Sequence, residues 1–244
     1  MTSPGSPAVH RAARVLAELA ANPSGVSVPE LARRLGTAKS SVSDLVSTLL
    51  VEGAVTRDEQ GTVRLGARIA EIARGFVGGT RLIEEFRRAC ARITEVDGAA
   101  VVLAVLVGGD IAHVAVREGD RPLPLTLTPG MRLPAWSTAT GIALLTELPD
   151  VVVDRLYRNE PAASPSGLIF DADRLLLARK ACRTRGWASN EGVEEMTLAG
   201  TAAVIAVDGR PLAAVGVVRA QGSARHATDA AAIGRLAHEL ASRA

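Results

Sequence analysis

Six polar side chains recur within residues 39–47 at spacings that could place them on one face of a helix. They are Lys39, Ser40, Ser41, Ser43, Asp44 and Ser47. An ammonium can reach a phosphate or a guanine, hydroxyls can meet phosphates or several bases, and a carboxylate can accept from cytosine N4. We interpret this stretch as a DNA-contacting face. The alternatives are an ordinary solvated helix face and, for Asp44, an acid that stabilises the helix dipole.

A second group of residues could bind a small ligand. The run Ser137, Thr138, Ala139, Thr140 and Gly141 directly precedes an apolar helical segment. Backbone N–H groups at a helix start can bind a ligand oxygen, although N-capping by Ser137 or Thr138 would also explain the run. Trp136 and Trp187 are the two tryptophans of the chain, and each could line a pocket or pack in a core.

Residues arranged for catalysis are missing from the sequence. The histidines at 10, 113, 226 and 238 have no carboxylate or cysteine partner at a recognisable spacing, and His113 reads as a core residue on an apolar strand. Neither a nucleophile elbow, a dinucleotide or phosphate loop, nor zinc-ligand spacing occurs. Cys90 and Cys182 fit a reducing compartment. We therefore expect no enzyme activity, no cofactor and no metal site.

The elements that would position the first group form a helix-turn-helix over residues 29–50. Ala32 is small enough for two crossing helices, Gly36 tolerates the positive φ of a tight turn, and Val42 faces inward. Four leucines occupy further inward positions at helical spacing: Leu31, Leu35, Leu45 and Leu49. An ordinary pair of antiparallel helices is the alternative.

A short hairpin follows and favours the DNA-binding interpretation. Gly53 can end the second helix, residues 55–57 and 62–65 read as strands, and residues 58–61 read as a turn. A helix-turn-helix followed at once by a hairpin is a winged helix, whose second helix enters the major groove. Arg57 and Arg64 on the hairpin are candidate phosphate contacts, or simply exposed arginines.

Length and charge set further bounds. The chain has 244 residues, enough for two domains, with 48% hydrophobic but only 2% aromatic residues. Its net charge is +2, and residues 1–75 alone also carry +2, so strong DNA binding would need charge placement and a dimer. The first seven residues lack the features of a signal peptide and read as a disordered tail. The longest apolar run, residues 99–107, is too short to span a membrane, so we expect a cytoplasmic protein.

The rest of the chain reads as helices and antiparallel strands. Helices are expected over residues 9–21, 65–77, 82–96, 139–148, 151–157, 172–185 and 228–243. Extended segments are expected over residues 99–107, 111–118, 123–128, 201–207 and 211–218. This order indicates an α+β domain behind the winged helix.

Taken together, these features resemble the isocitrate lyase regulator (IclR) family of bacterial transcription regulators. Four stretches carry the resemblance, over residues 25–66, 133–149, 185–200 and 201–218. The resemblance implies a winged-helix DNA-binding domain (8–66), a connector helix (67–79) and a GAF-like antiparallel-sheet domain for effector binding and oligomerisation (80–244). It implies a repressor that binds a double-stranded DNA operator as a homodimer or tetramer and responds to a small organic metabolite, with no membrane partner.

The effector site implied by the resemblance departs from the family pattern. Its candidate residues are Trp136, Ser137, Thr138, Ala139, Thr140, Gly141, Trp187, Asn190, Thr201 and Gly216. In the recognition helix the family usually has a basic residue where this chain has Asp44. At the effector site it usually has a lysine where this chain has Ile142, often serines where this chain has Gly216 and Val218, and an acid where this chain has Ser189 or Asn190. Because anion anchors are missing, we expect an aromatic or mostly apolar ligand. The alternative is a C-terminal domain that only oligomerises.

Overall fold

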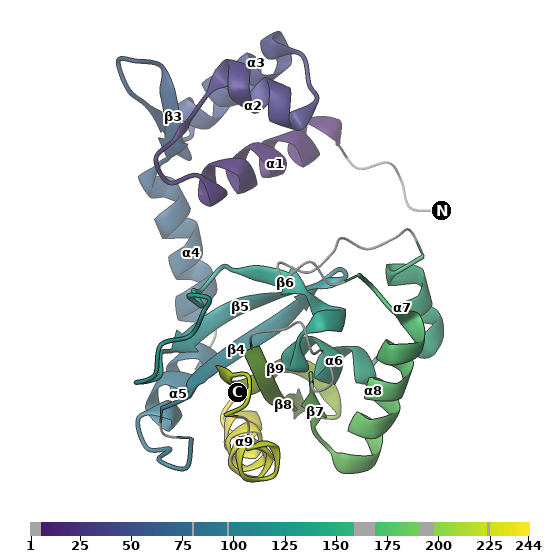
Figure 1. Ribbon diagram of the computed structural model, residues 1–244. Coiled ribbons are helices and arrows are strands. Elements are labelled where there is room, and N and C mark those ends of the chain that lie inside the picture. The colour runs from purple at the N-terminus through teal and green to yellow at the C-terminus, as the bar shows by residue number, and fades with distance from the viewer. Residues whose placement is uncertain (1–5, 80, 97, 159–168, 191–197, 224) are drawn as a thin grey trace. The chain divides into compact units, whose positions relative to one another are not determined.

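The structure is a computed structural model that describes residues 6–79, 81–96, 98–158, 169–190, 198–223 and 225–244 (Figure 1). It divides into two compact units, residues 1–79 and residues 80–244. Of the tail expected over residues 1–7, residues 1–5 lie outside the described residues, whereas Pro7 already belongs to the first helix.

The first unit is a winged helix. Its elements are α1 (Pro7–Ala21), β1 (Val26–Ser27), α2 (Val28–Leu35), α3 (Lys39–Val51), β2 (Val55–Arg57), β3 (Thr62–Leu65) and α4 (Ala67–Gly79). The three strands pair antiparallel in the order β1-β3-β2. The core is aliphatic, as the composition requires, and contains Val15, Leu19, Leu31, Val42, Val46 and Val63.

Local signals fix the helix-turn-helix. The Ser27 hydroxyl accepts a hydrogen bond from the backbone N–H of Glu30 and begins α2, with Pro29 in the first turn. Gly36 ends α2 in the left-handed conformation, at φ 61°. Only Thr37 and Ala38 separate Gly36 from the first residue of α3, Lys39, so the chain reverses within one tight turn, as the sequence predicts.

The second unit is built on a six-stranded antiparallel sheet. Its elements are α5 (Arg81–Cys90), β4 (Ala100–Val107), β5 (Asp110–Arg117), β6 (Arg132–Pro134), the 3₁₀ turn η1 (Ala135–Ser137), α6 (Ala139–Thr146), α7 (Asp150–Leu156), α8 (Ala172–Arg185), β7 (Ala188–Ser189), β8 (Leu198–Val207), β9 (Arg210–Ala220) and α9 (His226–Ala241). The strand order is β6-β5-β4-β9-β8-β7. This α+β architecture confirms the expected fold class.

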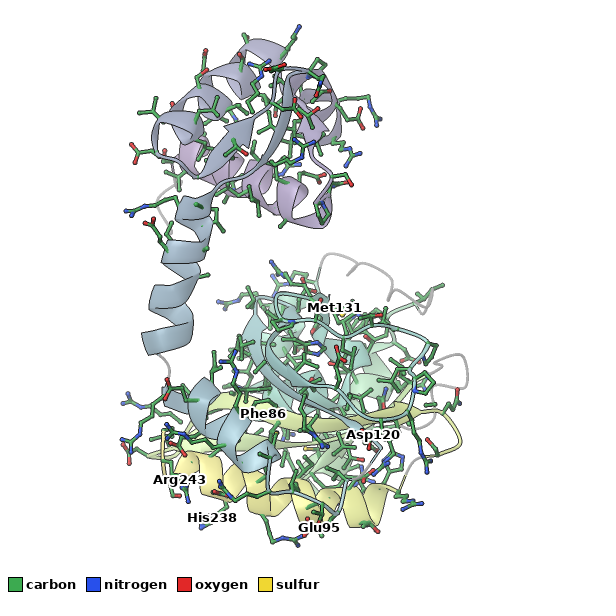
Figure 2. The ribbon with its side chains drawn as sticks, turned by 90° about the vertical axis from the view of Figure 1, so that its left-hand side faces the viewer. Phe86, Glu95, Asp120, Met131, His238 and Arg243 are labelled. Atoms are coloured by element: carbon green, nitrogen blue, oxygen red, sulfur yellow. The ribbon has the colours of Figure 1, made fainter. Side chains whose placement is uncertain are left out.

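Helices cover both faces of this sheet (Figure 1). On one face α9 packs against β8 and β9, and α5 lies beside it, with Phe86 of α5 fully buried (Figure 2). On the other face α6 packs across the central strands, and α8 packs against α6 and the edge strand β7. The central strands β4, β9 and β8 therefore have side chains buried on both faces, whereas β5 alternates between buried and half-buried residues.

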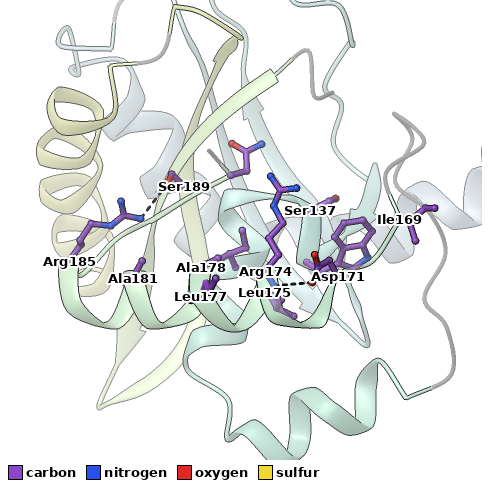
Figure 3. A pocket seen from close by; sticks show the side chains of 13 residues that line it. Ser137, Ile169, Asp171, Arg174, Leu175, Leu177, Ala178, Ala181, Arg185 and Ser189 are labelled. Atoms are coloured by element: carbon purple, nitrogen blue, oxygen red, sulfur yellow. Dashed lines mark hydrogen bonds between the residues drawn. The ribbon is translucent and has the colours of Figure 1, made fainter. Parts of the chain in front are cut away.

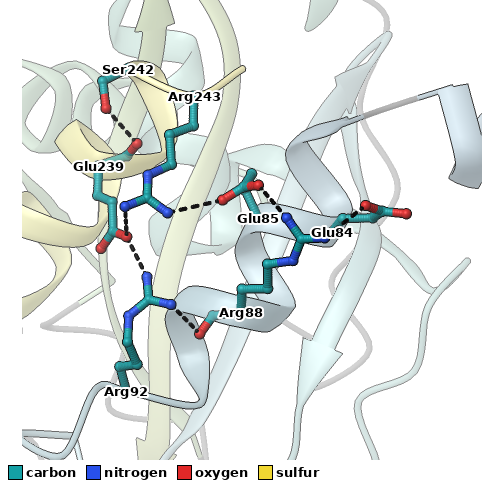
Figure 4. Close-up of polar contacts among 7 residues, drawn as sticks. All are labelled: Glu84, Glu85, Arg88, Arg92, Glu239, Ser242 and Arg243. Carbon is teal, nitrogen blue, oxygen red and sulfur yellow. Dashed lines mark hydrogen bonds and ion pairs between the residues drawn. The ribbon is translucent and has the colours of Figure 1, made fainter.

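Ion pairs join α5 and α9 (Figure 4). Glu85 is 6% exposed and accepts hydrogen bonds from Arg88 at 2.8 Å and from Arg243 at 3.2 Å. The Arg243 guanidinium, followed by Arg88, holds the pKa of the Glu85 carboxyl below its usual range. Glu239 of α9 also pairs with Arg243 and with Arg92. These contacts hold the end of the chain to α5.

Two expected elements differ in the structure. The helix expected to reach residue 96 ends at Cys90. The backbone N–H of Arg92 donates to the carbonyl of Ala89, three residues earlier, and the carbonyl of Arg88 accepts from the Arg92 guanidinium instead, so the α-helical hydrogen bonding stops there. Residues 123–128 form a loop rather than a strand, and β6 pairs with β5 instead. Pro124 lacks the N–H that a strand ladder needs, and Leu127 is buried against Ala100 and Val102.

Within the described part of the chain, every helix is too short or too polar to cross a membrane.

Candidate DNA-binding face and ligand cavity

The outward face of α3 is polar and open. Val42 and Val46 are fully buried, so the helix turns Lys39, Ser40, Asp44 and Ser47 to solvent, with Ser41 and Ser43 half-buried. Among the described residues the side chains of Lys39, Ser40, Ser43 and Asp44 form no hydrogen bond or ion pair, whereas Ser47 donates to the Ser43 carbonyl at 2.9 Å. The inward set is less complete than expected, since Leu45 and Leu49 are only half-buried.

The two wing arginines have different surroundings. Arg64 donates to Asp58 at 2.7 Å and to the Ser24 carbonyl at 3.1 Å. The same guanidinium, helped by the Thr62 backbone N–H, holds the pKa of Asp58 below its usual value. Arg57 is exposed and forms no ion pair within the described residues. Arg64 therefore stabilises the hairpin through these contacts, and Arg57 is the better candidate for a phosphate contact.

In the second unit the start of α6 is capped from within. Thr138 accepts a hydrogen bond from the Gly141 N–H at 3.1 Å, while the Ser137 hydroxyl donates to the Pro134 carbonyl at 2.9 Å. Thr138 is therefore an N-cap, as one of the two interpretations of the sequence expected. The Gly141 N–H, which was a candidate ligand donor, already donates to Thr138. The backbone N–H groups of Ala139 and Thr140 have no acceptor among the described residues.

Gly141 has a packing role. A Cβ added there would lie 2.1 Å from the Ala135 carbonyl oxygen, so only glycine lets η1 and α6 approach so closely. Gly141 is not among the described residues that line the hollows near α6, and its expected contact with a ligand stays a prediction. Gly216 is comparable, because its missing side chain makes room for the Thr140 methyl, 2.8 Å from an added Cβ.

A small cavity of about 50 Å³, which we call the ligand cavity, lies on the sheet face at the start of α6. Its described walls are mostly apolar and carry no charged side chain: Val102, His113, Leu127, Leu133, Thr138, Ala139, Thr140, Asn190, Leu198, Ala199, Gly200, Val217 and Val218. Of the expected effector residues, the structure brings Thr138, Ala139, Thr140 and Asn190 together here.

His113 is a cavity residue that the sequence interpretation missed. It is 3% exposed, and its Nδ1 has no hydrogen-bond partner among the described residues. Burial lowers the pKa of the imidazole to about 4, so it is neutral at pH 7. The available signal was a single polar residue at an inward position of an apolar strand, although nothing in the sequence says which helix covers it.

A wider hollow of about 300 Å³, the α8 groove, is lined by α8 and η1 (Figure 3). Trp136, Ser137 and Asn190 line it together with Arg174 and Arg185 of α8. Trp136 meets Phe170 edge-on at 5.7 Å between ring centres. Because Asn190 lines both the ligand cavity and the α8 groove, the two hollows adjoin.

Two expected effector residues lie elsewhere. Trp187 lines a different hollow and stacks on His226, with Arg185 over its ring at 4.1 Å. Thr201 hydrogen bonds with His226 of α9 at 2.7 Å. Strand alternation turns Gly200 toward α6 and therefore Thr201 toward the opposite face. The expectation that these two residues line the pocket with Trp136 is thus corrected.

Comparison with known proteins adds independent findings. Residues 8–59 match the family model of the IclR helix-turn-helix domain, and residues 75–242 match that of the bacterial transcriptional regulator IclR C-terminal domain. HTH-type transcriptional regulator Rv1719 of Mycobacterium tuberculosis is 31% identical over 148 residues, 60% of this chain and 56% of that protein. The chain spans little more than half the length of most of the curated relatives it matches.

Solved structures agree in fold. The repressor BlcR of Agobacterium tumefaciens is 26% identical, with a TM-score of 0.59 over 99% of this chain and 100% of that one. An IclR homologue of Microbacterium hydrocarbonoxydans complexed with 4-hydroxybenzoate is 20% identical, with a TM-score of 0.77 over 97% and 98% of the two chains.

Proposed function

The chain belongs to the IclR family of bacterial transcriptional regulators, and we propose that it is a repressor whose operator binding responds to a small organic metabolite. It is a DNA-binding regulator by family. The observation that carries the proposal furthest is the outward face of α3, where Lys39, Ser40, Ser43 and Asp44 have no partner among the described residues. Polar groups left free on a helix of this kind are suited to read base edges.

The operator is proposed to be palindromic or pseudo-palindromic and bound by a homodimer or tetramer. Each chain supplies one reading helix, and the net charge of residues 1–75 is only +2, so one copy makes few phosphate contacts. Two-fold symmetry doubles those contacts and places half-sites about one helical turn, or a multiple of it, apart. Footprinting of the full chain on a selected operator tests this, and protection of one asymmetric half-site by a monomer would contradict it.

The metabolite is proposed to bind where the ligand cavity meets the α8 groove. The cavity is about as large as one or two water molecules, so it has room for one polar group of a ligand. The adjoining α8 groove is large enough for an aromatic ring. Neutral His113 and the free N–H groups of Ala139 and Thr140 suit a hydroxyl or carbonyl. We therefore favour an aromatic or mostly apolar ligand, in keeping with the 4-hydroxybenzoate of the Microbacterium structure.

Thermal-shift measurements of the full chain with 4-hydroxybenzoate, phenol and benzoate test this choice. A ligand that acts as an effector should also change operator affinity by about 5- to 150-fold, the usual size of such coupling. 4-Hydroxybenzoate should stabilise the chain more than benzoate, because the cavity groups suit a hydroxyl, whereas Arg174 and Arg185 of the groove can pair with the carboxylate of either compound. Compounds that stabilise the chain and leave operator affinity unchanged would favour a C-terminal unit that only oligomerises.

A further inference from the structure

We propose that Arg11 and Arg14 of α1 form a second DNA contact, an anchor for backbone phosphate beside the reading helix; this rests on the DNA-binding function above. The anchor is a hollow of about 560 Å³ between α1 and the turn that joins α2 to α3. Its walls are Pro7, His10, Arg11, Arg14, Leu35, Gly36, Thr37, Ala38 and Ser41. We call this hollow the arginine cradle.

The spacing on α1 builds one side of the cradle. Pro7, His10, Arg11 and Arg14 recur at intervals of three and four residues, so they lie along one face of the helix. Val15 and Leu19 are buried and hold another face of α1 in the core. The two arginines are therefore presented at the surface by a helix whose rotation the core fixes.

The cradle is positively charged and its cations are available. Its described walls include no acidic side chain, and among the described residues neither Arg11 nor Arg14 forms an ion pair. Other arginines of the same unit differ: Arg34 pairs with Glu30 and Glu18, and Arg68 pairs with Glu71. The charges of Arg11 and Arg14 are thus not compensated by an acidic side chain among the described residues, which leaves them available to a partner outside the unit.

The floor of the cradle suits a phosphate. A Cβ added at Gly36 would meet nothing within 4 Å, so the turn is bare, and the N-cap residue Ala38 offers no side chain to the start of α3. The backbone N–H groups of Lys39, Ser40 and Ser41 have no acceptor among the described residues. Guanidinium groups and free helix-start N–H groups both bind phosphate readily in proteins.

Position selects the DNA backbone as the source of that phosphate. Ser41 of the cradle lies on α3, within the stretch that also presents Lys39 and Asp44. When α3 lies in the major groove, the sugar–phosphate backbone passes close to the N-terminus of α3, beside which Arg11 and Arg14 lie. The contact is independent of base sequence, so it adds affinity without specificity.

The test measures binding of the full chain to a fluorescein-labelled duplex of arbitrary sequence by anisotropy, over a series of KCl concentrations. Arg11→Ala and Arg14→Ala should each flatten the plot of log K against log salt by about 0.9 for each phosphate that the variant no longer binds. When the salt concentration is raised fourfold, the affinity of the wild-type chain should therefore fall by a factor about three times larger than the affinity of the variant does. The matched control is Arg68→Ala, which removes one exposed arginine already paired with Glu71.

The outcomes separate the anchor from DNA binding itself. Flattened slopes for Arg11→Ala and Arg14→Ala, with an unchanged slope for Arg68→Ala, support the anchor. Unchanged slopes for both α1 variants, while Lys39→Ala lowers affinity, would overturn the anchor and leave DNA binding by α3 intact. Equal flattening by all three arginine variants would also overturn it, because net charge alone would then explain the effect. Because DNA-binding proteins also bind arbitrary sequences at low salt, a wild-type chain that binds no duplex even at the lowest KCl concentration would contradict the proposed function.

Discussion

The starts of α3 and α6 show how one kind of element serves two uses. α3 begins after Ala38 without a side-chain cap, and its first residues are exposed beside cations. α6 begins after Thr138, which caps it, and all eight of its residues are buried. An open, uncapped start can meet a large external anion, whereas a buried, capped start leaves few donors for a small enclosed group. Substitutions at the two helix starts should therefore have different consequences.

The largest effect is expected at Gly141 in the first turn of α6, and a smaller one at Gly36 in the turn that precedes α3. Gly141→Ala forces a Cβ to within 2.1 Å of a backbone oxygen, which should cost about 3 kcal/mol of the free energy of unfolding of the second unit. The Cβ of Gly36→Ala would contact no other atom, but alanine would have to adopt the left-handed φ of 61°. We expect this to cost about 1 kcal/mol of the free energy of unfolding of the first unit.

Urea unfolding separates these two variants. Tryptophan fluorescence reports the second unit, since Trp136 and Trp187 are the two tryptophans of the chain, and circular dichroism reports both units. Equal losses from the two substitutions would contradict the contrast between a buried and an open helix start.

The next largest effect concerns acid. The folded-state pKa of His113 is lowered to about 4 by burial, from its usual value of 6.5, so protonation favours the unfolded chain. The stability that the neutral imidazole gives is present above pH 6.5 and is lost as the pH falls toward 4. From about pH 7 to about pH 5 we expect the second unit to lose about 2 kcal/mol through this group.

His113→Gln is the control for that prediction. It removes the titrating group, so its urea midpoint by tryptophan fluorescence should fall less over the same pH range than the wild-type midpoint does. The same fall in both proteins would mean that His113 does not titrate with a lowered pKa.

A smaller effect is expected from the cap itself. Thr138→Ala leaves the Gly141 N–H without its acceptor and should cost about 1 kcal/mol of the free energy of unfolding of the second unit. Ser40→Ala on the first turn of α3 removes no bond among the described residues, so a change within about 0.5 kcal/mol is expected. Thermal unfolding of each variant measures both; a larger loss for Ser40→Ala would show that the stability of α3 depends on the Ser40 hydroxyl.

The two units also differ in how much of their structure the sequence could predict. The winged helix is local: Ser27, Gly36 and the buried valines act within a few residues, so its elements and outward face followed from spacing. In the second unit the four long strands and most helices were also predictable, since their apolar runs are long, whereas the short edge strands β6 and β7 were not. The loop over residues 123–128 was not, because Leu123, Leu125 and Leu127 alternate like a strand while Pro124 prevents pairing.

The ligand cavity depended on contacts between distant segments. His113, Thr138 and Asn190 come from β5, the start of α6 and the residue after β7, and no spacing relates them. Thr201 and Trp187 were placed with them by resemblance, yet strand direction and the end of α8 turn them elsewhere. Arg11 and Arg14 were visible as charges, but their lack of acidic partners among the described residues required the structure.

Whether the outward face of α3 reads base edges is best decided by selecting bound duplexes from a random library. Wild-type protein should select two half-sites related by two-fold symmetry. Asp44→Ala should lose the preference at one position of each half-site, by about 1–3 kcal/mol. Glu52→Ala removes an exposed acid at the other end of the same helix and should select the wild-type motif. An unchanged motif for Asp44→Ala would contradict base reading by this face.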